Sequence, residues 1–274
     1  DLSILVEFAT MVSSKSQWAE KLGFRDLAIG FANSLQEEIN FELEARNMIQ
    51  VQTVMKKSLQ HIKVPKVYRQ YSTDSVLVME YINGSSVSKA SMLYDSQKID
   101  RKKYAEMLLF SFLEQALVSG IFHADPHPGN IFIEDGTNQI TLLDFGAVGR
   151  LGAIQQEGLK LFLVGINQNN AAVVTDGIEL FVENVEDIKR DELERQISDV
   201  LLRISYIDQI EASELIYTIF TIISDNGLKL YPAVSIALRV LVTLDGTLRI
   251  IDPKFDIFLE AKQFSSDYIK STLK

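Results

Sequence analysis

The stretch GIFHADPHPGNIFIEDGTNQITLLDFGAVG, residues 120–149, decides the fold. It places Asp125, Asn130 and Asp144 among many Ile, Leu and Phe residues. A carboxylate in apolar surroundings is unfavourable unless it is paired, hydrogen-bonded or bound to a metal ion. The three polar side chains therefore indicate a functional site.

The second half of this stretch is typical of a β-hairpin. The runs NIFI (130–133) and ITLLD (140–144) are β-prone and flank the turn-forming EDGTNQ. Antiparallel pairing would bring Asn130 and Asp144 within one or two strand spacings of about 4.8 Å. Asp125 precedes Asn130 in a Pro- and Gly-rich loop that cannot be helical, so it can lie over the same point.

These three side chains form an oxygen-rich set suited to Mg²⁺ that holds phosphate, with Asp144 as a direct ligand and Asn130 as a second. In sequence they form H-x-D-x-x-x-x-N at 123–130, then the hairpin, then D-F-G at 144–146. This is the motif pair of protein-kinase-like phosphotransferases, in which the first aspartate is catalytic. Each motif alone is weak, but both in this order are specific. The alternative is that Asp125 and Asn130 cap a turn while Asp144 ends a strand.

Two histidines lie in the same loop. His123 is expected to hydrogen-bond to backbone groups and so orient the loop. For His127 two roles remain open, packing within the loop and contact with Asp125 or phosphate.

Two upstream segments fit the same plan. VLVMEYING (76–84) is typical of the strand and hinge that hold adenine in kinases, with Met79 as gatekeeper and the backbone of Glu80 and Ile82 facing the base. Its alternative is an ordinary core strand. On the predicted helix QEEINFELEARN, Glu44 is a candidate to orient a phosphate-binding lysine, although such charged residues usually form a solvated helix face.

The remaining pattern predicts a small mixed part, residues 1–83, and a larger helical part, residues 84–274. Apolar periodicity predicts helices within residues 1–60, one of them capped by Ser34 with Glu37 as its partner. Further elements are predicted as follows: antiparallel strands at KVYRQYS (66–72) and SVLVMEYI (75–82), a break at NGSS (83–86), a helix at 100–119 with its apolar stripe at Met107, Leu108, Phe112, Leu113 and Ala116, and helices from 153 onward, broken at NQNN, SDNG and YP.

Composition excludes several classes. The 274 residues are 47% hydrophobic, which supports a sizeable core, and the formal net charge of −10 argues against a nucleic-acid partner. The absence of cysteine excludes disulfides and thiolate chemistry. Residues 214–224 are too short to span a membrane, for which about 20 residues are needed. Because the first residue is Asp, we expect the natural chain to begin upstream.

Five segments together resemble the UbiB/AarF/ADCK family of atypical protein-kinase-like proteins. They are EEINFELEARN, VPKVYRQYSTDSVLVMEYINGSSV, GIFHADPHPGNIF, LLDFGAVGRLG and LVTLDGTLRIIDPKFD. The resemblance implies an α+β, two-lobed kinase-like fold with a mostly helical C-lobe and, here, an incomplete N-lobe. It also implies binding of ATP with Mg²⁺, and a link to ubiquinone and prenyl-lipid metabolism at membranes.

The family's functional residues carry over onto matching positions. Asp125 matches the catalytic aspartate, Asn130 and Asp144 match the metal ligands, and Glu44 matches the glutamate of the helix before the hinge. Glu38 matches the first residue of the family's E-x-D element. The aspartate of that element is Asn40 here, which puts its charge-dependent role in doubt.

A larger departure is that the K-x-G-Q motif, the nucleotide loop and the Val-Ala-x-Lys strand are absent from this sequence. Lys15 and Lys21 lack the strand context of a phosphate-binding lysine. The sequence is therefore expected to begin just after the missing strands.

Three functions remain open at this stage. The leading one is a Mg²⁺- and ATP-dependent kinase-like ATPase supporting prenyl-quinone biosynthesis, cytoplasmic and peripheral to a membrane, or mitochondrial or plastid in a eukaryote. Its partners would be nucleotide and prenyl lipid or quinone-biosynthesis proteins. The alternatives are a small-molecule phosphotransferase of the aminoglycoside or choline kinase type, and a pseudokinase scaffold that binds a lipid or protein.

Overall fold

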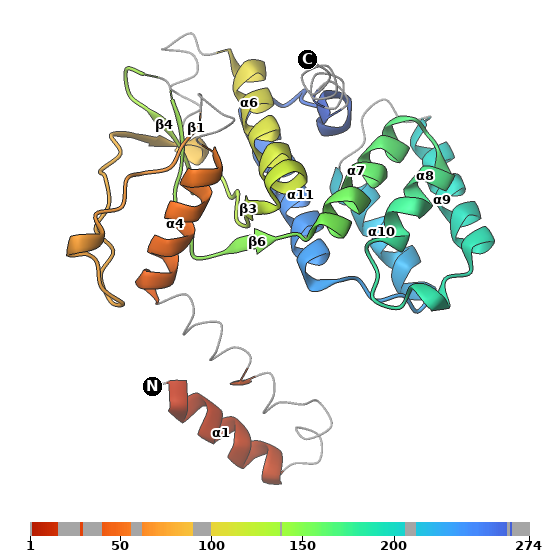
Figure 1. The fold of residues 1–274 in the computed structure, drawn as a ribbon, viewed down its shortest axis with the longest axis horizontal. Coiled ribbons are helices and arrows are strands. Elements are labelled where there is room, and N and C mark those ends of the chain that lie inside the picture. The colour runs from red at the N-terminus through yellow and green to blue at the C-terminus, as the bar shows by residue number, and fades with distance from the viewer. Residues whose placement is uncertain are drawn as a thin grey trace.

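The structure is a computed structural model, shown as a ribbon in Figure 1. It describes residues 2–15, 28–29, 40–55, 62–89, 100–137, 139–205, 212–261 and 264. Helices α6 and α11 lie at the centre of the view, with α4 and the sheet on one side and α7 to α10 on the other.

Helices α1 (Leu2–Lys15) and α4 (Phe41–Met55) precede the sheet. Helix α4 begins at Phe41 because the Asn40 side chain caps it: Asn40 Oδ1 accepts a hydrogen bond from the Leu43 N–H at 3.1 Å. The predicted cap at Ser34 with its partner Glu37, and Glu38, lie outside the described residues.

A mixed sheet of four strands, in the order β1-β5-β4-β2, carries the predicted hairpin. Strands β4 (Ile131–Glu134) and β5 (Ile140–Leu142) pair antiparallel with Ile131 opposite Leu142, which confirms the hairpin. Strand β1 (Ile62–Lys63) runs parallel to β5. The sheet therefore combines segments that are far apart in the sequence.

The predicted break at NGSS is wrong, because Gly84–Ser86 forms strand β2 and pairs antiparallel with β4. Gly84 makes this pairing possible. A Cβ at this position would lie 2.3 Å from the Ile133 carbonyl oxygen, so a larger residue would push the two backbones apart.

The two predicted strands before β2 pair antiparallel over a short length. The Tyr68 N–H donates to the Val78 carbonyl at 2.9 Å, and the Glu80 N–H donates to the Lys66 carbonyl at 2.8 Å. A 3₁₀ turn, η1 (Arg69–Tyr71), then leads the chain away from the ladder. The hairpin is real, but its ladder is reduced to a single bridge between Val67 and Met79.

Helix α6 (Arg101–Leu113) begins at the Asp100 cap and continues as a π-helical turn, η3 (Glu114–Ser119). The predicted helix at 100–119 is thus confirmed. Four residues of its predicted stripe, Leu108, Phe112, Leu113 and Ala116, are buried in the core, and Met107 packs partly buried against it.

Strands β3 (Ile121–His123) and β6 (Val148–Arg150) pair as a second, two-stranded sheet. In the sequence, one strand precedes the β4–β5 hairpin and the other follows it. The other described elements are the short turns η2 (Val87–Lys89) and η4 (Val185–Asp187) and the helices α7 (Ala153–Asn167), α8 (Ala171–Glu179), α9 (Arg190–Ser205), α10 (Ala212–Asp225) and α11 (Pro232–Ile251). The predicted helical breaks at NQNN, SDNG and YP are confirmed.

One hydrophobic core runs through these elements. It joins Met48 and Val51 of α4 to Leu109 of α6, Ile140 of β5 and Leu244 of α11. Among the described residues, no helix combines the length and the hydropathy needed to cross a membrane.

Candidate active site

Asp125 and Asn130 meet at one end of the hairpin. Asn130 Nδ2 donates to Asp125 Oδ2 at 2.9 Å, while the Asn130 N–H donates to the His127 carbonyl at 2.8 Å. These two hydrogen bonds therefore hold the segment from Asp125 to Asn130 in a closed loop. Because the amide nitrogen of Asn130 faces Asp125, Oδ1 is the amide atom left to contact a cation.

Asp144 follows the second strand and lies at the same end of the hairpin. The N–H of the preceding residue, Leu143, donates to the Asn130 carbonyl at 2.8 Å. Asp144 therefore directly follows a residue that is hydrogen-bonded to Asn130. Asp144 is exposed and has a φ of 60°, and its Oδ1 accepts from the Gly146 N–H at 3.2 Å. The structure thus brings Asp125, Asn130 and Asp144 together as the sequence predicts.

His123 has the predicted loop-orienting role. The Asp125 N–H donates to His123 Nδ1 at 3.2 Å, and His123 Nε2 contacts the Leu143 carbonyl at 3.0 Å. Burial lowers the pKa of His123, which favours the neutral ring. Because Nδ1 accepts a hydrogen bond, the proton must be on Nε2, which donates to Leu143. The ring also packs edge-on against Phe145, with centroids 4.8 Å apart.

His127 is exposed and makes its hydrogen bond within the loop. Its Nδ1 accepts from the Gly129 N–H at 3.2 Å. This contact supports the packing role that the sequence left open for His127.

Glu44 reaches the site from α4. Its Oε1 accepts a hydrogen bond from the Phe145 N–H at 3.1 Å. Burial raises the pKa of Glu44 above its ordinary value of 4.5, the hydrogen bond from Phe145 opposes this shift, and the charge of Asp144 adds to it. In the described part of the chain its partner is a backbone amide of the D-F-G segment, whereas the sequence suggested a lysine.

The predicted hinge residues lie beside the sheet. Ile82 is buried and Met79 is 37% exposed. The sequence predicts that the backbone of Glu80 faces the base. Its N–H, however, donates to the Lys66 carbonyl and is not free to do so. Within the described ranges, the Glu80 carbonyl and the Ile82 N–H have no backbone partner, which leaves one acceptor and one donor for a nucleobase.

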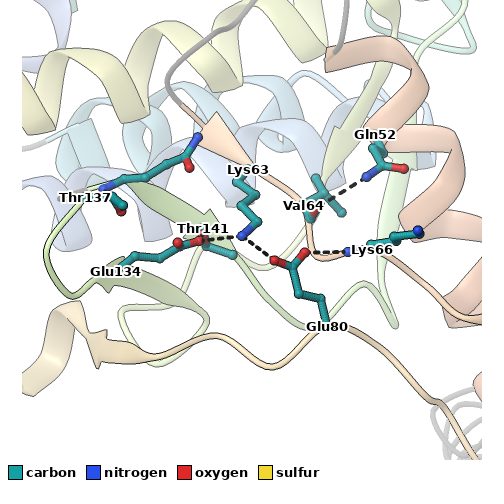
Figure 2. A network of polar contacts seen from close by, with 9 residues as sticks. Gln52, Lys63, Val64, Lys66, Glu80, Glu134, Thr137 and Thr141 are labelled. Atoms are coloured by element: carbon teal, nitrogen blue, oxygen red, sulfur yellow. Dashed lines mark hydrogen bonds and ion pairs between the residues drawn. The ribbon is translucent and has the colours of Figure 1, made fainter.

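A charged cluster fixes the Glu80 side chain. Figure 2 shows the Lys63 ammonium between two carboxylates, 2.6 Å from Glu80 Oε1 and 3.0 Å from Glu134 Oε1. Thr141 Oγ1 donates to the same Glu134 oxygen at 2.6 Å. Although burial opposes the charge, the hydrogen bonds to Glu80 and Glu134 raise the pKa of Lys63. The bond to Lys63 in turn lowers the pKa of Glu80. The cluster links β1, the hinge and the hairpin.

Several residues that support the site belong to no motif in the sequence. Thr247 of α11 donates from Oγ1 to the Pro126 carbonyl at 2.8 Å, within the H-x-D-x-x-x-x-N segment, residues 123–130. Gln115, in the π-helical turn, accepts from the His123 N–H at 3.0 Å. Asn47 of α4 donates to the Phe145 carbonyl at 2.9 Å. Thr247 and Asn47 lie in segments that carry the family resemblance, but no motif reveals their contacts.

The fold and the site together define a kinase-like α+β protein. The chain belongs to the ABC1 atypical kinase-like domain family, whose sequence profile matches residues 1–177. This confirms the family that the five sequence segments resemble.

Two curated relatives show the extent of the similarity. Protein ACTIVITY OF BC1 COMPLEX KINASE 8, chloroplastic, from Arabidopsis thaliana is 34% identical over 62% of this chain and 22% of its own length. The "Probable protein kinase UbiB" of Cellvibrio japonicus is 26% identical over 99% of this chain and 50% of its own length. The chain therefore spans half or less of these two relatives.

Among solved structures, the Rv3197–erythromycin complex from Mycobacterium tuberculosis is similar with a TM-score of 0.54 and 17% identity. The match covers 84% of this chain and 58% of the other. At this identity the likeness concerns the fold.

Proposed function

We propose that this chain binds ATP with Mg²⁺ and forms part of an atypical kinase-like enzyme that hydrolyses ATP or transfers its terminal phosphate. The observation that carries the proposal is the convergence of Asp125, Asn130 and Asp144 at one end of the hairpin. It is supported by membership of a kinase-like family.

The donor set fits Mg²⁺. Asn130 Oδ1 and the Asp144 carboxylate supply hard oxygen ligands, and nucleotide phosphates and water would complete an octahedral shell. The bound cation would neutralise charge on the phosphate oxygens. Met79, the Glu80 carbonyl and the Ile82 N–H would hold the base.

Asp125 would accept the proton of an attacking hydroxyl or water. The hydrogen bond from Asn130 Nδ2 holds one of its oxygens in place, and its own N–H is held by His123. Glu44, and Glu38 outside the described residues, would act from the N-terminal side of the site, where Glu44 holds the D-F-G backbone.

The physiological role is proposed from the relatives. We infer that the complete protein supports ubiquinone or prenyl-lipid biosynthesis, since one relative is named UbiB. A peripheral position at a membrane, facing the cytoplasm or within a plastid, is proposed on the same ground, because another relative is chloroplastic. Prenyl lipid or quinone-biosynthesis proteins would be its partners.

The test is calorimetric titration of the 274-residue chain with ATP, with and without Mg²⁺. Asp144→Asn removes a metal ligand, and Asp135→Asn is the matched control on the exposed hairpin turn. We expect Mg²⁺-dependent binding to weaken at least about 10-fold in Asp144→Asn, because a neutral amide binds the cation less well. It should stay unchanged in Asp135→Asn.

Asp125→Asn separates binding from chemistry. Binding should persist, while turnover by the complete protein should fall by about 10²–10⁴-fold. Equal Mg²⁺-dependent binding by wild type and Asp144→Asn, or no binding by a chain shown to be folded, would overturn the proposal.

A further inference from the structure

Asp144 has a strained backbone. Its φ of 60° lies in the left-handed region, which is unfavourable for a residue other than glycine. Such a conformation persists only where the surrounding structure holds it. The contacts of the two neighbouring residues show what holds it.

The preceding residue, Leu143, is held by the catalytic loop. Its N–H donates to the Asn130 carbonyl at 2.8 Å, and its carbonyl accepts from His123 Nε2 at 3.0 Å. Both backbone groups of Leu143 are therefore occupied by residues of the H-x-D-x-x-x-x-N motif.

The following residue, Phe145, is held by helix α4. Its N–H donates to Glu44 Oε1 at 3.1 Å, and its carbonyl accepts from Asn47 Nδ2 at 2.9 Å. The Phe145 side chain is fully buried, so the peptide has little freedom to move with its ring. Asp144 thus lies between two residues whose backbone N–H and carbonyl groups are both hydrogen-bonded.

Helix geometry explains how α4 can do this. Glu44, Asn47 and Gln50 are spaced three residues apart, so each neighbouring pair is adjacent on the helix surface and the row winds gradually around the helix. Arg150, at the end of β6, donates to Asn47 Oδ1 at 3.2 Å and to Gln50 Oε1 at 2.8 Å. The three side chains therefore contact successive parts of the segment that follows Asp144.

Asn47 is the central member of this row and is 3% exposed. Its amide uses both ends: the nitrogen donates to a carbonyl and the oxygen accepts from a guanidinium. If the Asn47 amide were flipped, its oxygen would face the Phe145 carbonyl oxygen and its nitrogen would face the Arg150 guanidinium. Both contacts would be unfavourable, so these two neighbours fix the orientation of the amide. Unlike Glu44, Asn47 holds the segment without adding a negative charge beside Asp144.

We propose that Asn47 is a positioning residue for the metal ligand Asp144, and that through it helix α4 sets the conformation of the D-F-G segment. This deepens the proposed function, on which its metal-binding part rests. Loss of the Asn47 donor leaves the buried Phe145 carbonyl without its partner and frees the Phe145–Gly146 peptide to rotate. The N–H of that same peptide donates to Asp144 Oδ1, so its rotation would release the carboxylate. The carboxylate would then spend less time where Asn130 Oδ1 can share a cation with it.

Two variants isolate the donor. Asn47→Leu removes both ends of the amide, whereas Asn47→Asp keeps an acceptor for Arg150 and removes the donor to Phe145. Gln52→Leu is the matched control. Gln52 lies on the same helix, but it donates to the Val64 carbonyl at 3.4 Å (Figure 2) and not to the D-F-G segment.

The first readout needs no ligand. In hydrogen exchange followed by mass spectrometry, the peptide covering residues 143–150 should exchange at least about 10-fold faster in both Asn47 variants than in wild type, since local opening becomes easier. It should be unchanged in Gln52→Leu. If Asn47→Leu does not fold, Asn47→Asp decides. Unchanged exchange in a folded Asn47 variant overturns the proposal.

The second readout is the ratio of ATP affinities measured with and without Mg²⁺. Both Asn47 variants should reduce this ratio at least about 10-fold while leaving Mg²⁺-free affinity unchanged, a split that a general loss of stability would not produce. If the wild-type chain binds no ATP, the proposed function fails, and the exchange result alone decides whether Asn47 holds Asp144. An unchanged ratio in a chain that does bind Mg²⁺ and ATP overturns the proposal.

Discussion

A single hydroxyl on helix α11 holds the H-x-D-x-x-x-x-N segment, residues 123–130. Thr247 Oγ1 donates to the Pro126 carbonyl, and the two residues are 121 positions apart. Thr247→Val has nearly the same shape but removes the donor, so a buried carbonyl loses its partner at a cost of about 1–3 kcal/mol. We expect a lower midpoint of urea unfolding and weaker Mg²⁺-dependent ATP binding.

The control is Thr243→Val, one turn earlier on α11, where Oγ1 donates to Arg239 within the same helix. Its effect should stay within about 0.5 kcal/mol. If the two variants unfolded at the same midpoint and bound ATP equally well, Thr247 would have no special role in the loop.

At this scale the sequence predicts the residues of the loop better than their supports. Asp125, Asn130 and Asp144 belong to motifs whose spacing is fixed by one hairpin, so their meeting follows from local structure. His123 is local in the same sense. Thr247 and Asn47 act on backbone atoms far away in the sequence, and a backbone carbonyl leaves no signature in a residue pattern.

Among the elements, β1 and the hinge are joined by the ion pairs of Lys63 with Glu80 and Glu134. Because these groups ionise, the stability of the protein should depend on pH. The hydrogen bond from Lys63 lowers the pKa of Glu80 below its ordinary value of 4.5. The sign follows: the stability that Glu80 contributes is present above about pH 4.5 and is lost as the pH falls through its lowered pKa in the folded state.

Glu80→Gln should therefore be less stable than wild type at pH 7, by on the order of 1 kcal/mol, since the pair is partly exposed. The difference in melting temperature should vanish in acid, where Glu80 is protonated. Glu183→Gln, at an exposed position, should follow the wild-type curve throughout. A Glu80→Gln deficit that persisted unchanged in acid would argue against the ionic tie.

Element boundaries were predictable where local chemistry sets them and not where pairing sets them. The cap at Asp100 and the proline at the start of α11 act through their own backbone neighbours. Gly84 reads as a break in any one-dimensional pattern, yet its missing Cβ lets β2 approach β4. The apolar pattern continues through Asn40, yet α4 begins only after it, because the Asn40 side chain caps this helix.

For the whole molecule, the shared core predicts that α4 and the helical body unfold together. Met48 of α4 is 1% exposed and belongs to the same hydrophobic cluster as Leu244 of α11. Met48→Ala should lower the free energy of unfolding by about 2–5 kcal/mol. Hydrogen exchange in urea should show α4 and α11 losing protection at the same midpoint.

An exposed control is Ile154→Ala, at 63% exposure, which should change the stability by less than about 0.5 kcal/mol. Separate midpoints for α4 and α11 would instead support the division into residues 1–83 and 84–274 as independent units.

The kinase-like class was predictable because the motif pair is specific. The shared sheet was not, since β1 and β2 are too short to stand out.

The π-helical turn at Glu114–Ser119 makes the number of residues in this segment part of the site. Such a turn holds one residue more than the α-helix it interrupts, and it places Gln115 against the His123 N–H. Removing one residue after Gln115 would allow a regular helix up to Gly120 but would rotate Gln115 by about 100° relative to β3. Among relatives, loss of this support would therefore be visible as a one-residue gap in the alignment, even where every motif residue is retained.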